Sequence, residues 1–173
     1  MRRVVSVLMA TVLLVIALVS PVAGQTPLDE RRVREGVPLE TFTFEAGIGC
    51  EFDVEVSDLD GKITYVFITV DRHGNYLDRY IYHTVTRYTN VETGASYTRR
   101  FDSVENGLIR PDGSARFVFR NDALYLGGEP GPLDPGLYLV DNGRAVTEYD
   151  AEGNVVVDVI ESGEIIDLCA ELT

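Results

Sequence analysis

Hydrophobic and polar residues alternate along most of the chain beyond residue 50. From Cys50 to Val56 every second residue is apolar, and acidic side chains lie between them. This period of two is typical of a β-strand that buries one face. Ile63–Val70 is instead apolar or β-branched at nearly every position, which favours a strand covered on both faces.

Short segments of the same kind recur up to the C-terminus. The further predicted strands are Tyr76–Val91, Ser96–Val104, Leu108–Ile109, Ala115–Arg120, Leu137–Val140, Ala145–Tyr149, Val155–Ile160 and Ile165–Leu168. The dipeptides Asp60-Gly61, Asp112-Gly113 and Asn142-Gly143 between such segments are typical of tight hairpins. The pattern predicts an all-β fold, either an antiparallel β-sandwich or a closed β-barrel of about nine or ten short strands.

The first 24 residues follow a different pattern. Arg2 and Arg3 precede an apolar run from Val4 to Val19, and small residues follow it, as in a secretory signal peptide of the Sec type. An apolar helix of about 16 residues is about 24 Å long, shorter than the hydrocarbon core of about 30 Å. A cleaved signal is therefore favoured over a membrane anchor, and we expect a secreted protein without stable membrane insertion.

Cleavage after Gly24 leaves 149 of the 173 residues. Residues 25–37 are rich in charge and poor in apolar side chains, so we expect a flexible mature N-terminus. Residues 38–173 are expected to form a single β domain, since a chain of this length buries about two-thirds of its unfolded surface in one core.

Cys50 and Cys169 are the only cysteines. An even number in an exported protein predicts a disulfide, which here closes a loop of roughly 120 residues and stabilises the fold by up to about 5 kcal/mol. A metal site or a catalytic thiol is less favoured, because His73 and His83 are the only histidines and neither lies near a cysteine in sequence. We expect this disulfide to join the first strand to the last.

Three segments, together with the signal peptide, resemble a group of small exported bacterial all-β proteins. They are Gly49–Val54, the hairpin region Tyr88–Gly94 and the closing segment Asp167–Leu172. The resemblance covers most of the mature chain and implies the same fold and disulfide. Because these motifs are structural, it transfers no catalytic residue.

Charge is distributed unevenly. Without Arg2 and Arg3 the chain has 13 basic and 28 acidic residues, a net charge of −15, which argues against a general nucleic-acid binder. Residues 25–61 and 121–173 carry net charges of −7 and −11, whereas residues 62–120 carry +3. The central strands are thus the only basic part of the mature chain.

Within these strands, five residues form a candidate binding surface: Arg79, Tyr80, Tyr82, Arg87 and Tyr88. Alternation assigns the two arginines to one face of the strand and the three tyrosines to the other. Two structural alternatives apply, since a tyrosine-rich face can be core and the arginines can pair with acidic residues on neighbouring strands.

No catalytic, cofactor-binding or metal-binding motif is recognisable, so no enzyme and no cofactor are predicted. There is no Gly-x-Ser-x-Gly elbow and no nucleotide-binding glycine motif. The acidic clusters Asp58-x-Asp60-Gly61 and Asp150-x-Glu152-Gly153-Asn154 offer oxygen ligands for calcium but lack the full twelve-residue loop. Ordinary acidic turns are the favoured interpretation.

Three classes of function follow. The favoured one is a secreted, non-catalytic binding module of the cell envelope or exterior, with an envelope polysaccharide or another exported protein as partner. A β-barrel carrier of a small apolar ligand is the alternative, and an internal cavity lined by Phe, Tyr and Val would favour it. A carboxylate-dependent hydrolase is the second alternative, favoured by a cleft with two close acids, one of raised pKa.

The signal peptide and the disulfide give the first testable prediction. The intact mass of the secreted protein should correspond to a chain that starts at Gln25 or within one or two residues of it, and should lie about two mass units below the fully reduced value. Two titratable thiols in the native protein would contradict the pairing.

Overall fold

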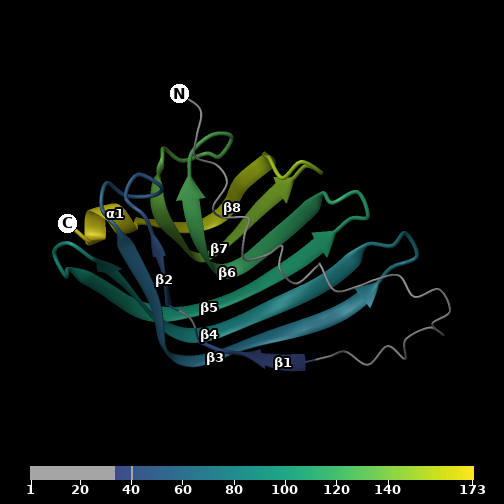
Figure 1. Ribbon diagram of the computed structural model, residues 1–173, viewed down its shortest axis with the longest axis horizontal. Helices are drawn as coiled ribbons and strands as arrows, with labels where there is room; N and C mark the ends of the chain where they lie inside the picture. Colours follow the sequence, from purple (N-terminus) through teal and green to yellow (C-terminus); the bar gives the residue numbers. More distant parts are fainter. Residues whose placement is uncertain (1–33, 40) are drawn as a thin grey trace. The chain divides into compact units, whose positions relative to one another are not determined.

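The computed structural model describes residues 34–39 and 41–173, so the predicted signal peptide and residues 25–33 lie outside the described residues. The described part forms an eight-stranded antiparallel sheet and one short helix (Figure 1). The elements are β1 (Arg34–Val37), β2 (Thr41–Phe44), β3 (Val54–Val70), β4 (Tyr76–Asn90), β5 (Ser96–Ile109), β6 (Ala115–Gly127), β7 (Gly136–Tyr149), β8 (Val155–Asp167) and α1 (Leu168–Glu171). The predicted all-β fold is confirmed.

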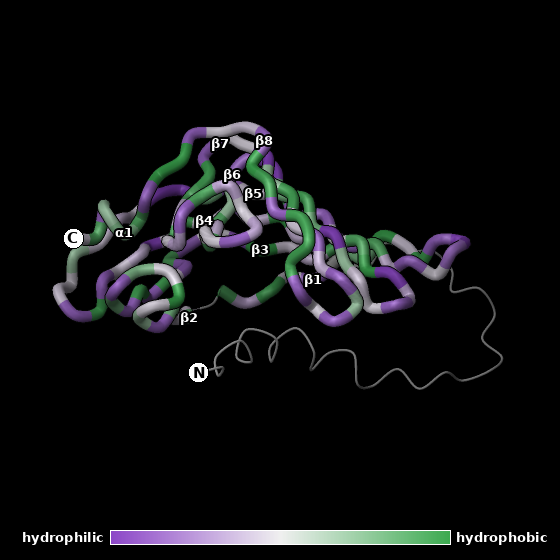
Figure 2. The backbone as a smooth tube through the Cα atoms, turned by 90° about the horizontal axis from the view of Figure 1, so that it is seen from above, coloured by the Kyte–Doolittle hydropathy of each residue, from purple (hydrophilic) through white to green (hydrophobic). Residues whose placement is uncertain are grey.

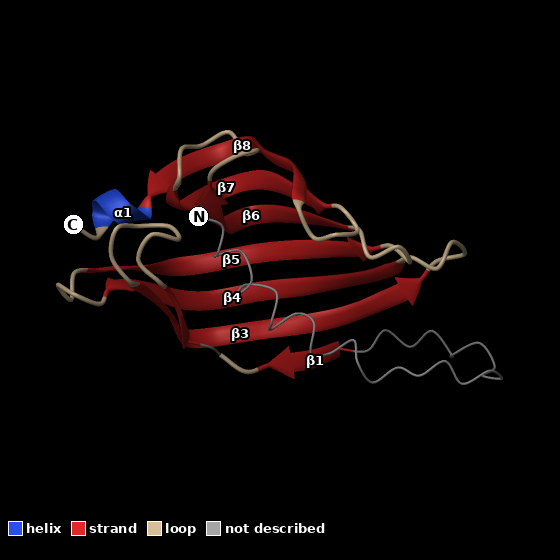
Figure 3. Ribbon diagram, turned by 45° about the horizontal axis from the view of Figure 1, so that its top comes forward, coloured by secondary structure: helices blue, strands red, loops and turns tan. Residues whose placement is uncertain are grey.

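Strands β3 to β8 form a meander in which each strand pairs with the next (Figure 3). β1 and β2 both pair with the free side of β3, β1 with Ile63–Val66 and β2 with Val54–Ser57. β8 forms the opposite edge and does not pair with β1 or β2, so the sheet is open. Of the two predicted architectures, the closed barrel is not formed.

The strands are fewer and longer than predicted, because two predicted hairpin turns lie inside strands. Asp60-Gly61 is part of β3 and Asn142-Gly143 is part of β7, each beside a shift in the pairing register. Gly61 has φ +115° and Asn142 has φ +49°. Glycine and asparagine tolerate positive φ at a β-bulge as well as in a hairpin turn, so the dipeptides alone do not distinguish the two.

These irregular positions lie close to one line across the sheet, with Asn121 offset by two residues from the register of Gly61. Gly61 pairs with Thr84, and Asn121 pairs with Gly143. A Cβ atom built on Gly163 would lie 2.7 Å from the Cα atom of Gly143, so these two glycines allow the backbones of β7 and β8 to touch. Bulges bend a strand and increase its twist. The sheet is accordingly curved (Figure 1).

At this line the sheet separates into two layers. β5 and β6 pair only between Ser103–Ile109 and Ala115–Asn121. Beyond the bend, β5 continues to pair with β4 alone, and β6 with β7 alone. One end of the molecule is therefore sandwich-like, while the other end is a single layer.

The main hydrophobic core lies between the two layers. Val54, Val56 and Tyr88 of the first layer pack in one cluster with Leu137 and Leu139 of the second. Figure 2 shows hydrophobic and hydrophilic positions alternating along the strands, as expected when one face of each strand is buried. The prediction that the alternate, apolar residues of a strand form its buried face is confirmed for these residues.

Helix α1 covers one end of this core. Leu168 and Leu172 are fully buried in the same cluster. The side-chain amide of Asn90 donates a hydrogen bond to the carbonyl oxygen of Leu172 at 3.1 Å. The described part of the chain contains no helix that is long and apolar enough to span a membrane.

The Cys50–Cys169 disulfide is present, with 5.5 Å between the two Cα atoms and 119 residues of separation. Neither cysteine lies in a strand: Cys50 is in the bend before β3, and Cys169 is in α1. The expectation that the disulfide joins the first strand to the last was therefore wrong. The bond instead attaches α1 to the sandwich-like end.

The prediction that residues 25–37 are flexible is corrected for residues 34–37, which form β1 and pair with β3. This strand consists of Arg-Glu-Gly-Val and lacks an apolar face. Its hydrogen bonds use backbone groups, so pairing does not require the apolar side chains that the sequence lacks here.

The bend gives a prediction for Gly61. A Cβ atom at this position would overlap the carbonyl oxygen of His83 and lie 2.6 Å from the Cα atom of Thr84. We expect Gly61→Ala to lower the free energy of unfolding by roughly 3 kcal/mol or more, measured by urea denaturation.

Gly94 provides the matched control, because its φ is also positive, +76°, but a Cβ atom there would meet nothing within 4 Å. Gly94→Ala should lower the free energy of unfolding by only about 1 kcal/mol, the effect of backbone strain alone. Equal losses in the two variants would contradict the close approach of β3 and β4 at Gly61.

Candidate functional site

A cavity of about 280 Å³ lies where the two layers separate. Its lining residues come from β2 to β6: Phe42, Val56, Asp58, Ile63, Tyr82, Thr86, Tyr88, Phe101, Ser103, Glu105, Phe119, Ala123 and Leu124. Pockets for small molecules have volumes of about 300–1,000 Å³. This cavity is close to the lower limit and suits a molecule with a single ring.

Aromatic side chains form much of the wall. Phe101 meets Tyr82 edge to face, with ring centroids 6.0 Å apart and an interplanar angle of 78°. Tyr88 and Phe119 also line the cavity. Phe42 is 45 % exposed, so this side of the cavity reaches the surface of the molecule.

Polar groups in the wall are incompletely paired. The Asp58 Oδ1 atom accepts a hydrogen bond of 2.7 Å from the Thr86 hydroxyl. The Tyr82 hydroxyl donates to Glu105 Oε2 over a long 3.4 Å. Ser103 is 2 % exposed, and its hydroxyl has no hydrogen-bond partner among the described residues. A buried hydroxyl without a partner loses the hydrogen bonds that water would give it, which is unfavourable.

The Glu105 carboxyl titrates close to neutral pH. Burial raises its pKa from 4.5 to about 7, and the charge of Asp78 contributes in the same direction, while the hydrogen bond from Tyr82 opposes the rise. Burial also raises the pKa of Asp78 and of the Tyr82 and Tyr88 hydroxyls. The tyrosines are therefore neutral at physiological pH, and Glu105 carries only part of a charge.

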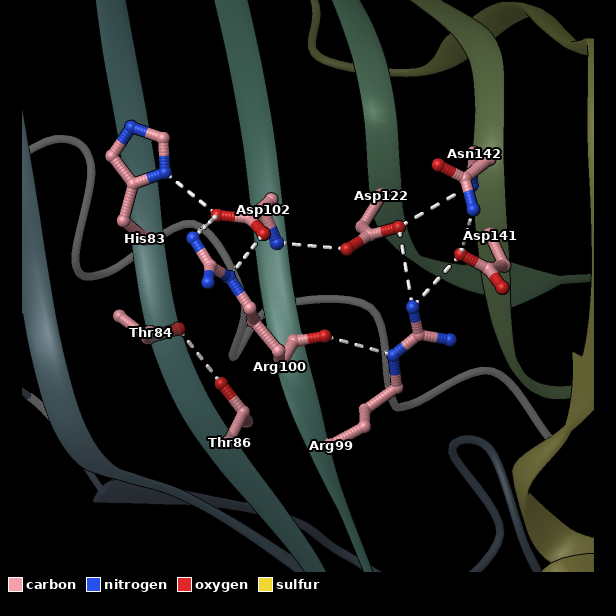
Figure 4. Close-up of polar contacts among 9 residues, drawn as sticks. All are labelled: His83, Thr84, Thr86, Arg99, Arg100, Asp102, Asp122, Asp141 and Asn142. Atoms are coloured by element: carbon pink, nitrogen blue, oxygen red, sulfur yellow. Dashed lines mark hydrogen bonds and ion pairs between the residues drawn. The ribbon is translucent and has the colours of Figure 1, made fainter.

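A second group of polar residues lies where β5 and β6 part (Figure 4). The buried Asp122 carboxylate accepts hydrogen bonds from the backbone N–H of Asp102, at 2.7 Å, and of Asn142, at 3.3 Å. Arg99 lies 3.5 Å from Asp122 and 2.8 Å from Asp141. The pairing of β5 with β6 has ended at this point. The Asp122 side chain therefore accepts the hydrogen bond of the Asp102 N–H in place of a backbone carbonyl of a partner strand.

These charges compensate one another. The hydrogen bond from Arg99 holds the pKa of Asp141 below its ordinary value, whereas burial raises the pKa of Asp122 despite its backbone donors. An adjoining cleft of about 440 Å³ is lined by the same residues together with Arg100 and Asn121. Because the charged groups are already paired, the arrangement stabilises the fork between β5 and β6.

His83 and Asp102 form a hydrogen-bonded pair on the face of β4 and β5 that points away from the cavity. His83 Nδ1 lies 2.7 Å from Asp102 Oδ1, and this contact, followed by that with Arg100, lowers the pKa of Asp102. A histidine held by an aspartate occurs in hydrolytic triads. Among the described residues, however, Asp102 is the only hydrogen-bond partner of His83, and Thr84 and Thr86 turn the other way (Figure 4). The pair is a surface interaction on exposed side chains.

The five residues of the predicted binding surface do not come together on one face. Tyr82 and Tyr88 line the cavity, and Tyr88 is only 1 % exposed. Tyr80 lies beside Tyr82, with ring centroids 6.1 Å apart. Arg79 and Arg87 alternate with these tyrosines and point to the opposite side of the sheet. Core packing, the structural alternative, applies to Tyr88.

Several cavity residues were not predicted from the sequence. Phe101, Ser103 and Glu105 are alternate residues of β5, so the period of two could have assigned their side chains to one face of the strand. Asp58 of β3 was expected to belong to an acidic turn, with calcium binding as the alternative. Its position in the cavity wall depends on the register and the bend, which local patterns do not contain.

The two predicted acidic turns use their carboxylates internally. Asp60 accepts a hydrogen bond from the backbone of Gly61, and Asp150 accepts from Glu152 and Asn154. The described residues include no group of three or more His, Cys, Asp or Glu side chains positioned to hold a metal ion.

Comparison with protein-family models, with curated proteins and with solved structures found no match for this chain. Function is therefore argued from the geometry of the cavity.

Glu105 gives a prediction on pH. The unfolded chain has the ordinary pKa of 4.5 and the folded state about 7, so between these values the folded state keeps a proton that the unfolded chain loses. The free energy of unfolding should therefore fall as the pH rises from about 4.5 to about 7, by roughly 3 kcal/mol at most.

Glu105→Gln should remove this part of the pH dependence, so that the variant gains stability over the wild type at pH 8 but not at pH 4. Urea denaturation at several pH values measures the difference. Glu164→Gln, at an exposed residue of β8, has the same change in charge and should follow the wild-type curve. Parallel curves for Glu105→Gln and the wild type would contradict the raised pKa.

Proposed function

We propose that this chain is an exported, non-catalytic binding module that holds a small, largely apolar ligand between the two layers of its sheet. The observation that carries the proposal is the aromatic cavity of about 280 Å³ with an unpartnered, buried hydroxyl at Ser103. Export is supported by the signal-like N-terminus and by the disulfide, which is compatible with an extracellular protein.

The cavity supports this function because protein interiors are normally close-packed. Voids larger than a water molecule are few, and an empty one lowers stability by loss of contacts. Here the gap lies beside a tightly packed core, in which Val54, Leu137 and Leu139 have no exposed surface. A ligand would restore contacts to the rings and a hydrogen bond to Ser103.

The opposite face of the sheet supports a second proposal, an interaction with an envelope polysaccharide or another exported protein. Arg79 is exposed there, and Asn106 is the only hydrogen-bond partner of its side chain among the described residues. Arg100, further along the same face, is instead paired with Asp102. An anionic partner would be attracted locally and repelled by the chain as a whole, and both effects decay over about 8 Å at physiological ionic strength. Such a partner would bind weakly.

A carboxylate-dependent hydrolase is favoured by one observation, the presence of Asp58 and Glu105 in the same cavity with a raised pKa at Glu105. Glycosidases use two carboxyl groups about 5 to 9 Å apart, across a cleft that admits a sugar chain. A cavity of about 280 Å³ is small for such a substrate. Hydrolysis of nitrophenyl glycosides by the wild type, abolished by Glu105→Gln, would establish the hydrolase instead of the binding module.

The proposed function is tested by filling the cavity. Ser103→Leu replaces the unpartnered hydroxyl by an isobutyl group that occupies the space of a ligand. Ligand-detected NMR with phenethyl alcohol, benzyl alcohol and p-cresol as neutral single-ring probes should detect binding to the wild type and a loss of about tenfold or more in Ser103→Leu.

The melting temperature of Ser103→Leu should stay the same or rise, because an apolar group replaces an unsatisfied polar one. Ser96 lies on the same strand but outside the cavity wall. The control variant Ser96→Leu should therefore bind the probes like the wild type. Failure of all three probes to bind the wild type, or equal binding by Ser103→Leu, would overturn the proposal.

A further inference from the structure

We infer that the ligand of this cavity is an amine that binds as its ammonium ion, with the amino group attached to a single ring or to an apolar chain of similar size. The inference rests on the proposed function and adds the chemical class of the ligand. It follows from the charges, the free acceptors and the rings that line the cavity.

The charged groups in the wall are all of one sign. Asp58 and Glu105 line the cavity, and its lining within the described part of the chain contains no lysine, arginine or histidine. Arg99, on the same strand as Glu105, is turned to Asp122 and Asp141 at the fork (Figure 4). An anionic ligand would be repelled by Asp58 and by the ionised form of Glu105, and a neutral ligand would leave these charges without a counter-charge in an apolar site. An ammonium group supplies that charge.

The cavity wall also offers free acceptors for the N–H donors of a primary ammonium group. From the residues that the structure describes, the Glu105 carboxylate accepts a single, long hydrogen bond, donated by Tyr82. Asp58 accepts from Thr86 through Oδ1, and the described residues donate no hydrogen bond to its Oδ2 atom. The Ser103 hydroxyl is buried, unpartnered and able to accept. Ser103 and Glu105 lie two residues apart on the same face of β5, and Asp58 lines the cavity from β3.

The aromatic side chains suit the same ligand. Tyr82, Phe101 and Phe119 line the cavity beside the carboxylates. A cation within about 6 Å of a ring face is attracted by the electrons of the ring, and the attraction is stronger in a desolvated site. Val56 and Leu124 supply apolar wall for the remainder of the ligand.

Ammonium binding should also release a proton from the protein at pH 7, because a nearby positive charge lowers the pKa of a carboxyl group. The titratable groups that influence Glu105 or are influenced by it are Asp78 and Tyr82 of β4 and Tyr149 of β7. Both tyrosines have raised pKa values and stay neutral. Proton release that disappears in Glu105→Gln is therefore assigned to Glu105 rather than to Asp78.

Three probes with the same ring and nearly equal size test the inference: phenethylamine, phenethyl alcohol and hydrocinnamate. They present a cation, a neutral group and an anion. Isothermal titration calorimetry of the disulfide-bonded mature protein at pH 7 should give an affinity for the amine about tenfold or more above that for the alcohol, and no detectable binding of the carboxylate. Titration of the amine in buffers of different ionisation enthalpy measures the released proton.

Variants of the two carboxylates identify the groups responsible. Glu105→Gln and Asp58→Asn should each lower the affinity for phenethylamine by about tenfold and leave the affinity for phenethyl alcohol nearly unchanged. Glu164→Gln is the control for the change in net charge and should bind both probes like the wild type. Because the probe series is measured on the wild type, the test does not depend on the folding of any variant.

The outcomes separate this inference from the proposed function. Equal affinity for the amine and the alcohol, or binding of hydrocinnamate as strong as that of the amine, would overturn the amine assignment and leave a neutral-ligand site. Binding of the amine that is unchanged in both carboxylate variants would overturn it as well. Absence of binding by all three probes to the wild type would overturn the proposed function and the amine assignment together.

Discussion

The rest of the structure depends on a line of residues with left-handed backbone that crosses the sheet. Gly61, Asn121, Asn142 and Gly163 have φ angles of +115°, +70°, +49° and +119°. They belong to four different strands, and the pairing register and the contact between Gly143 and Gly163 bring them into line. A single bulge would bend one strand. Four aligned positions bend the whole sheet and allow its two halves to form separate layers at one end.

This bend creates a problem that charged side chains solve. Where β5 and β6 part, the backbone N–H of Asp102 has no strand partner, and an unsatisfied buried N–H group is costly. The Asp122 carboxylate accepts that N–H and the N–H of Asn142, and Arg99 compensates the buried charge together with Asp141. The most elaborate polar network among the described residues is thus explained by the fold.

The same separation produces both the core and the cavity. Near α1 the facing side chains are complementary, and Leu137, Leu139 and Leu168 are fully buried. At the bend, where β5 and β6 part, the side chains do not fill the space, which leaves the cavity beside Phe101 and Ser103. Burial then raises the pKa of Glu105, because the site removes water without providing a cation. A recess with this electrostatic character is a direct consequence of how the sheet bends.

Local sequence patterns determined the all-β class, the burial of Val54 and Val56, and the pairing of Cys50 with Cys169. Each of these depends on information within a few residues or on the cysteine count. Alternation also assigned Arg79 and Tyr80 to opposite faces, although the proposal that they belong to one binding surface did not respect that assignment.

The tertiary structure alone decided which turn-like dipeptides are turns and which residues meet in the cavity. Asp60-Gly61 and Asn142-Gly143 allow a positive φ, and this local property is equally compatible with a hairpin and with a bulge. Whether the chain reverses or only bends depends on the partner strands and on the burial of both halves. Asp58 and Glu105 are distant in sequence and come to one cavity through the register of β3, β4 and β5. Register and bend are set by contacts between strands, which no pattern within a single strand contains.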